Sequence, residues 1–256
     1  MTLKTPIDVS IEAGVALVSL NEPPVNAQTT EMAAALTAAF DGFNDAREVR
    51  AVVLTGAGRA FSAGADLKKR KTAGIEPGER WAHLRRTREL FYAVMECEKP
   101  VIAAVNGAAL GAGMVLAASA DIMIASETAV FGLPEIDVGL MGGARHAMEI
   151  FGRSLTRRMV FTGYRVPASE LYRLGIIEAC LPSDALLPAA MAMAGEISSK
   201  SPNAIRHAKR TLTTIGNLSL RDGYRFEQSM TAEFANHPDS QEALAAFSQK
   251  RKAIYD

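Results

Sequence analysis

No charged residue occurs between Val101 and Ala120, and this twenty-residue stretch does most to limit what the chain can fold into. Twenty residues is also the length of a membrane-spanning helix. Alanine dominates the stretch, however, and Asn106, Gly107, Gly111 and Gly113 interrupt it. Glycine and asparagine mark turns. The sequence therefore predicts a buried strand, a turn and a buried helix inside a globular protein, and no membrane span.

The composition excludes several classes of protein. Hydrophobic residues make up 48% of the 256 positions and charged residues 22%, which is typical of a globular chain with a substantial core. Lys and Arg together equal Asp and Glu at 28 each, which argues against nucleic acid as the main partner. The two cysteines lie in unrelated contexts and no metal-ligand spacing appears, so we expect neither a disulfide framework nor a metal site. The N-terminus lacks the apolar core of a signal peptide, so a cytoplasmic location is expected.

Apolar runs and helical periodicities alternate over residues 1–185, which predicts an α/β fold. Residues 186–256 are mostly helical in pattern. We expect this C-terminal region to pack on the core or to reach a neighbouring subunit, without forming an independent domain. The expected elements are a hairpin (7–11 and 15–20), strands (51–55, 101–105, 122–125 and 176–180) and helices (30–43, 79–98 and 111–119).

Two loops share one design, because each follows a buried strand, contains small residues and leads towards a helix. They are FSAGADLK, from residue 61, and NGAALGAG, from residue 106. Small residues allow a ligand to approach the main chain. Two backbone N–H groups aimed at one oxygen atom form an oxyanion hole. Ordinary tight turns use the same residues, so the loops alone leave both interpretations open. Neither loop completes a dinucleotide-binding or P-loop motif.

Five segments, in order and at matching spacing, make the sequence resemble the crotonase family, the enoyl-CoA hydratase/isomerase superfamily. They are NEPPVNAQTTEM, AVVLTGAGRAFSAGADLK, KPVIAAVNGAALGAGMVLAASADIMIAS, FGLPEIDVGL and ALAAFSQKRK. The resemblance implies a crotonase-like spiral of repeated β-β-α units in residues 1–185. It implies that residues 186–256 cover the active site and form the contacts of a homotrimer or a dimer of trimers.

The resemblance also implies an acyl-CoA thioester as substrate, with coenzyme A as part of that substrate and no tightly bound cofactor. An enolate would form next to the thioester carbonyl. By position, the two oxyanion-hole N–H groups fall on Ala65 and Ala112. The carbonyl of Ala63 would meet the adenine, Lys68 would lie near the CoA phosphates, and Lys250 would reach the CoA of a neighbouring subunit.

The acid–base residues are where this chain departs from the family pattern. Hydratases of the family use two glutamates, of which one falls on Glu135 while the position of the other is occupied by Val115. One carboxylate suffices to move a proton between two carbons, whereas hydration also needs a water molecule to be held. We therefore expect double-bond isomerisation with Glu135 as the single acid/base. The alternatives are a hydratase with a non-standard second polar group and a non-catalytic acyl-CoA-binding protein.

Polar residues after Glu135 are candidates for that second group. Asp137 would share the face of Glu135 if the segment were a strand. Gly143 begins a presumed site loop that continues into Arg145 and His146. His146 could act as an acid or base near neutral pH, and Arg145 could contact a substrate carboxylate or the thioester tail. The opposing interpretation places both side chains in solvent on the first turn of a helix.

Overall fold

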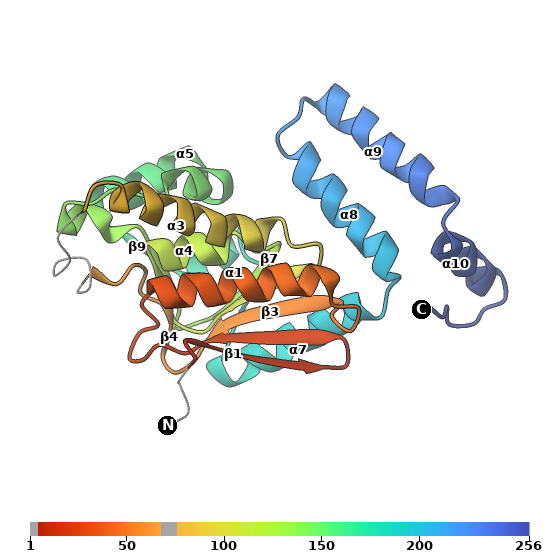
Figure 1. Ribbon diagram of the computed structural model, residues 1–256, viewed down its shortest axis with the longest axis horizontal. Coiled ribbons are helices and arrows are strands. Elements are labelled where there is room, and N and C mark those ends of the chain that lie inside the picture. The colour runs from red at the N-terminus through yellow and green to blue at the C-terminus, as the bar shows by residue number, and fades with distance from the viewer. Residues whose placement is uncertain (1–4, 68–75, 256) are drawn as a thin grey trace.

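The computed structural model describes residues 5–67 and 76–255, which form two β-sheets surrounded by helices (Figure 1). The larger sheet has six strands in the order β1-β2-β3-β5-β7-β10. Only β1 runs antiparallel to its neighbour. Every residue of β3 and of β5 is buried, as expected for central strands covered on both faces. The strands are β1 (Ile7–Glu12), β2 (Val15–Leu20), β3 (Ala51–Gly56), β5 (Val101–Val105), β7 (Ile122–Ser126) and β10 (Ala179–Leu181).

The smaller sheet has four strands in the order β4-β6-β8-β9. They are β4 (Ala60–Ser62), β6 (Ala108–Leu110), β8 (Val130–Gly132) and β9 (Arg165–Pro167). Three successive strand pairs are divided in the same way: β3, β5 and β7 enter the large sheet, while β4, β6 and β8 enter the small one. This is the spiral of repeated units that the sequence predicted.

The helices complete the repeats. The first, α1 (Thr30–Asp45), buries Met32, Leu36, Phe40 and Phe43 at helical spacing, and the hydroxyl of Thr29 caps it by accepting from the N–H of Met32 at 3.1 Å. The predicted helix is therefore confirmed. The other helices of the body are α3 (Glu79–Met95), α4 (Ala112–Ala118), α5 (Ala144–Thr162), α6 (Ala168–Arg173) and α7 (Ser183–Ser198).

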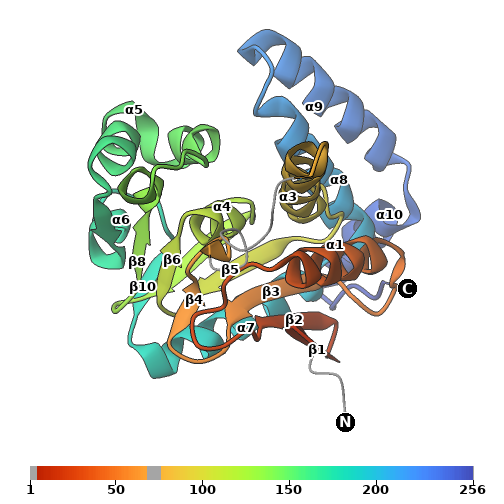
Figure 2. The ribbon, with the colours of Figure 1, turned by 60° about the vertical axis from the view of Figure 1, so that its left-hand side comes forward.

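The stretch without charges forms β5, β6 and α4, which confirms its interpretation as core. None of the helices within residues 5–67 and 76–255 combines the length and hydrophobicity needed to cross a membrane. Figure 2 shows α4 between α5 on one side and α3 on the other. Its position near the middle of the molecule explains why a helix of seven residues carries five buried ones.

The expected boundary at residue 186 needs correction, because it falls inside α7. Leu186, Ala190 and Ala194 follow helical spacing and pack against the large sheet, on strand residues such as Ile102 and Ile124. Helix α7 therefore belongs to the core. The helices that stand away from the body in Figure 1 are α8 (Pro202–Ile215), α9 (Leu220–Ala235) and α10 (Pro238–Ser248).

Helix α8 is joined to the body by a buried cation. The side chain of Lys209 is only 6% exposed, and its Nζ donates to the carbonyl of Lys99 at 2.9 Å and to Oδ2 of Asp121 at 2.7 Å. The same carboxylate oxygen accepts from the N–H of Val101 at 2.7 Å. A buried charge must be paired, so these contacts hold α8 against the start of β5.

Replacing Lys209 with methionine should destabilise the protein by about 2 kcal/mol, because it removes two hydrogen bonds from a buried cation, one to the carbonyl of Lys99 and one to the partly exposed carboxylate of Asp121. Urea unfolding would measure the change. The matched control is Lys200→Met, whose exposed pair with Glu196 spans 3.9 Å and should contribute almost nothing. Equal effects of the two substitutions would show that Lys209 does not anchor α8.

Candidate active site

The two small-residue loops that the sequence singled out lie in direct contact. Gly64, which follows β4, has a φ of +86°, and a Cβ built on it would lie 2.6 Å from the carbonyl oxygen of Leu110 and 3.1 Å from the nitrogen of Ala112. A side chain there would collide with the second loop and would also be strained. Glycine therefore allows the backbone that carries Ala65 to approach the backbone that carries Ala112.

The segment between β2 and α1 supports the first loop. The amide of Asn26 is buried and donates to three carbonyl groups, and the hydroxyl of Ser62 donates to the carbonyl of Asn26 at 2.7 Å. The N–H of Ala63 donates to the carbonyl of Val25 at 2.9 Å. These bonds explain why the NEPPVNAQTTEM segment and the FSAGADLK loop occur together. The three carbonyl groups that accept from Asn26 belong to Ala57, Ala60 and Phe61.

Two backbone N–H groups at this junction have no hydrogen-bond partner among the residues that the structure describes. Ala112 is the first residue of α4, where a helix leaves its N–H groups without intrahelical acceptors. Ala65 forms an isolated parallel bridge with Gln28, and that bridge uses the polar groups of the residues on either side of Ala65. Within residues 5–67 and 76–255, neither the Ala65 N–H nor the Ala112 N–H donates a hydrogen bond. The pair is therefore available to an acceptor from outside.

Glu135 brings a carboxylate to the same junction. It lies in the 3₁₀ helix η1 (Pro134–Val138), directly after β8. A Cβ built on Gly111, whose φ is +55°, would lie 2.7 Å from Oε1 of Glu135, so this side chain covers the turn that starts α4. The structure thus brings together three residues that the sequence predicted for the site: Ala65, Ala112 and Glu135.

The surroundings of Glu135 favour its protonated form. Its Oε2 atom is buried and has no hydrogen-bond partner among the described residues. Desolvation by burial raises the pKa of this carboxyl group, and a hydrogen bond from its own backbone only partly opposes that shift. A carboxyl group with a raised pKa is suited to accept a proton and release it again near neutral pH.

The position of the missing second glutamate is apolar. Val115 is 2% exposed, and a Cβ built on Gly143 would lie 2.8 Å from its Cγ2 and 2.7 Å from Cδ2 of Leu133. Gly143, an auxiliary candidate from the sequence, thus packs against this apolar pair and offers no side chain.

The expectation that Asp137 shares the face of Glu135 is wrong. That expectation required a strand, but the segment is a 3₁₀ helix with about three residues per turn, so residues two apart diverge. The exposed Asp137 lies instead beside the C-terminal end of α5, where a Cβ built on Gly163 would be 2.7 Å from its Oδ2.

Arg145 and His146 have different environments although they are adjacent in α5. The side chain of Arg145 is 70% exposed and pairs with Glu149, so it faces solvent. The half-buried His146 packs edge to face on Phe91 of α3, with ring centroids 5.6 Å apart. Desolvation by burial, aided by the charge of Arg145, lowers the pKa of His146, which keeps its ring neutral at pH 7.

Of the three residues expected to hold CoA, the structure describes Ala63 and Lys250. Lys68 lies outside the described residues. Ala63 is exposed beside the junction, and Lys250 is exposed just after α10, with a φ of +53°. Within the part of the chain that the structure describes, no group of three or more His, Cys, Asp or Glu side chains could hold a metal ion.

Sequence reasoning missed Gln28. Its side chain donates from Nε2 to the carbonyl of Ala112 at 3.0 Å, although the two residues are 84 positions apart. The available signal was a polar side chain among the apolar and small residues that follow Asn26, within a segment already singled out. The spacing of residues in the sequence does not show which loop the side-chain amide of Gln28 contacts.

Comparison with known proteins gives a consistent answer. The family model described as enoyl-CoA hydratase/isomerase matches residues 10–256. The 2,3-dehydroadipyl-CoA hydratase of Escherichia coli is 34% identical over 95% of this chain and 95% of its own length. A Mycobacterium tuberculosis enzyme, named as a hydrolase of a hexahydroindene-carboxyl-CoA, is 38% identical over 87% of this chain and 90% of its own. The crystal structure of enoyl-CoA hydratase from Bacillus anthracis has a TM-score of 0.92 and 31% identity, covering 98% of each chain.

Replacing Glu135 with glutamine should stabilise the protein at neutral pH. Because burial raises the folded-state pKa of Glu135, the free energy of unfolding of the wild type falls as pH rises from the ordinary pKa of glutamate, about 4.3, through the raised value. Glutamine removes this loss. We expect a gain on the order of 1 kcal/mol at neutral pH and none at low pH.

Urea melts of both proteins across that pH range would measure the difference. Glu178→Gln, at an exposed glutamate just before β10, serves as the control and should leave the free energy of unfolding nearly unchanged. A gain from Glu135→Gln that is equally large at low pH would contradict the prediction.

Proposed function

The chain belongs to the enoyl-CoA hydratase/isomerase family and is an enzyme of that type, and from this premise we propose that it moves a carbon–carbon double bond in an acyl-CoA thioester, with Glu135 as the single acid/base. The observation that carries the proposal is a partly buried carboxyl group, whose Oε2 has no partner among the described residues, next to an apolar wall. Glu135 covers the start of α4, while the second acid–base position is Val115, packed against Leu133.

The thioester carbonyl would be bound by the N–H groups of Ala65 and Ala112. Both groups lack a partner among the described residues, and their loops are in contact. Hydrogen bonds from both would stabilise the negative charge that develops on that oxygen when a neighbouring carbon loses a proton. Loss of one such donor typically costs a hundredfold to a thousandfold in rate.

Glu135 would carry the proton. Its carboxylate removes a proton from the α-carbon of a 3-enoyl thioester, and the electron pair of that C–H bond spreads over the carbonyl to give a dienolate. The resulting carboxylic acid then returns a proton to the γ-carbon, which leaves a 2-enoyl thioester. The raised pKa of Glu135 supports this role, because the group must hold the proton between the two steps.

Hydration requires polar groups that hold a water molecule, in addition to a general base. A water molecule must be held beside the double bond, and an ordered water needs several polar partners. Val115 and Leu133 supply none at the place where a second glutamate would stand. We therefore place hydration second.

Two alternative functions can be tested against the proposal. The E. coli relative is named a hydratase, and the half-buried, neutral His146 is the best remaining candidate for a second polar group. A non-catalytic acyl-CoA-binding protein would explain why valine occupies the position of the second glutamate. It would not explain why Oε2 of Glu135 is buried without a partner among the described residues.

The proposal predicts that the purified enzyme converts a 3-enoyl-CoA to a 2-enoyl-CoA faster than it hydrates a 2-enoyl-CoA. Glu135→Gln should lower isomerisation by about a thousandfold, since it removes the general base. Both reactions would be followed separately, by the absorbance of the conjugated thioester and by chromatography of the products.

Glu178→Gln is the matched control, because it replaces an exposed glutamate far along the chain from the junction and should leave both rates unchanged. Hydration faster than isomerisation would reject the proposal and favour the hydratase with His146 as a participant. Tight binding of both thioesters without turnover would favour the binding protein.

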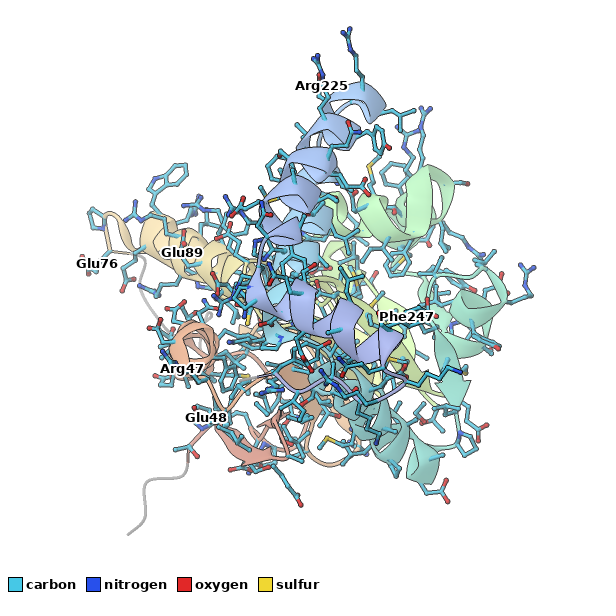
Figure 3. The ribbon with its side chains drawn as sticks, turned by 90° about the vertical axis from the view of Figure 1, so that its right-hand side faces the viewer. Arg47, Glu48, Glu76, Glu89, Arg225 and Phe247 are labelled. Atoms are coloured by element: carbon cyan, nitrogen blue, oxygen red, sulfur yellow. The ribbon has the colours of Figure 1, made fainter. Side chains whose placement is uncertain are left out.

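We further propose that α8, α9 and α10 contact other copies of this chain, as a homotrimer or a dimer of trimers. Phe247 of α10 is 86% exposed and Leu220 of α9 is 92% exposed. Figure 3 shows Phe247 near one end of α10, on the side of the molecule where these helices stand out. Large apolar side chains exposed on helices that stand away from the body suggest a protein interface. Lys250, directly after α10, would then lie close to a neighbouring subunit.

Phe247→Asp should shift the protein to a smaller assembly, because a charge at the interface would be desolvated without a partner. Light scattering coupled to size-exclusion chromatography would measure the mass. Arg225→Ala is the control on α9, where the side chain points away from the body in Figure 3. An unchanged mass for Phe247→Asp would reject Phe247 as an interface residue.

A further inference from the structure

Gln28 contacts both of the loops that meet at the candidate site. Its main chain belongs to the segment between β2 and α1, and its side chain extends towards α4. The family pattern assigned no function to this residue. Its contacts suggest one, and they fall into two sets.

The main chain of Gln28 brackets Ala65. Its N–H donates to the carbonyl of Gly64 at 2.7 Å, and its carbonyl accepts from the N–H of Asp66 at 3.2 Å. These two bonds form the isolated parallel bridge between Gln28 and Ala65. They fix the peptide groups on either side of Ala65 and leave the Ala65 N–H itself unused.

The side chain of Gln28 holds the other donor residue. Nε2 donates to the carbonyl of Ala112 at 3.0 Å, in a partly buried position. The bond fixes the first residue of α4, whose N–H is the second unused donor. The hydrogen bonds of Gln28 thus join the residues flanking Ala65 to Ala112.

We propose that Gln28 is a positioning residue that sets the separation and orientation of the Ala65 and Ala112 N–H groups. This inference rests on the proposed function, in which both groups bind the thioester carbonyl. Gln28 acts through the two alanines and does not itself touch the substrate.

The glycine contact alone does not fix this geometry. The absence of a side chain at Gly64 permits the loops to approach, but it supplies no directional bond between them. Ala65 and Ala112 belong to different repeats of the spiral, and α4 has only seven residues. A hydrogen bond from an amide to a carbonyl is directional, so it restrains the sliding of one loop past the other. A displacement of about 1 Å in a site of this kind can cost a hundredfold in rate.

Gln28→Met tests the proposal, because methionine has a similar length and shape but cannot donate a hydrogen bond. The first readout is the ultraviolet absorption of bound 2,4-hexadienoyl-CoA, which moves to longer wavelength when two donors polarise its carbonyl. We expect the wild type to give this shift and Gln28→Met to lose most of it. The second readout is isomerisation, where kcat should fall about tenfold while KM changes by less than about threefold.

Two further variants complete the experiment. Asn106→Leu is the matched control, because Asn106 also joins two loops, accepting from the N–H of Gly56 at 3.1 Å and donating to the carbonyl of Gly58 at 2.9 Å, but it holds neither donor residue. It should keep the spectral shift. Gln28→Leu repeats the test with a second apolar side chain, in case Gln28→Met does not fold.

The outcomes separate the two proposals. A spectral shift in the wild type that persists in Gln28→Met and in Gln28→Leu overturns the role of Gln28 and leaves the proposed function intact. A wild type that binds the probe without any shift overturns the carbonyl site and the inference with it. Loss of the shift in the Gln28 variants and also in Asn106→Leu would show a general effect of loosened loops, and it would overturn a specific role for Gln28.

Discussion

The contact between the backbones of two neighbouring repeats is the constraint on which the site depends. At Gly64 the first loop approaches the nitrogen of Ala112 so closely that no side chain fits between them. Gly113, one residue further on, is pressed in the same way against the carbonyl of Ser62, where a built Cβ would lie 2.2 Å from the oxygen. Two chain segments that are far apart in sequence are thereby held at main-chain distance. Polar main-chain groups from both are then available at one place.

The spiral explains why the reactive groups come in sequence order. Strands β4, β6 and β8 are neighbours in the small sheet and run parallel. Ala65 follows β4, Ala112 follows β6 and Glu135 follows β8. Because the carboxyl ends of parallel strands lie at one edge of a sheet, three successive repeats each deliver one group to the same edge. The central strands β3 and β5 of the large sheet, buried on both faces, hold these repeats in register.

Sequence patterns predicted what depends on local chemistry. The hairpin, the buried strands and the glycine-rich loops follow from residues close together in the chain, and the resemblance to a known family pointed to Ala65, Ala112 and Glu135 as site residues. The failures have a physical cause. Asp137 was misplaced because a 3₁₀ helix replaced a strand. The predicted core ended at residue 185, inside α7, because the apolar spacing of α7 does not show which surface that helix covers. Gln28 was overlooked because its importance lies in a bond across 84 positions.

The distribution of the site over three repeats separates two tasks. The first two repeats supply main-chain N–H groups, which any residue except proline can provide. The third supplies a side chain, Glu135, and α4 presents another at Val115. In the proposed function, substitutions at these two side-chain positions would alter where protons or water go while the main chain that binds the carbonyl stays unchanged. Under that proposal, such a fold could diversify its chemistry by single substitutions, because backbone geometry would recognise the thioester and side chains would choose the reaction.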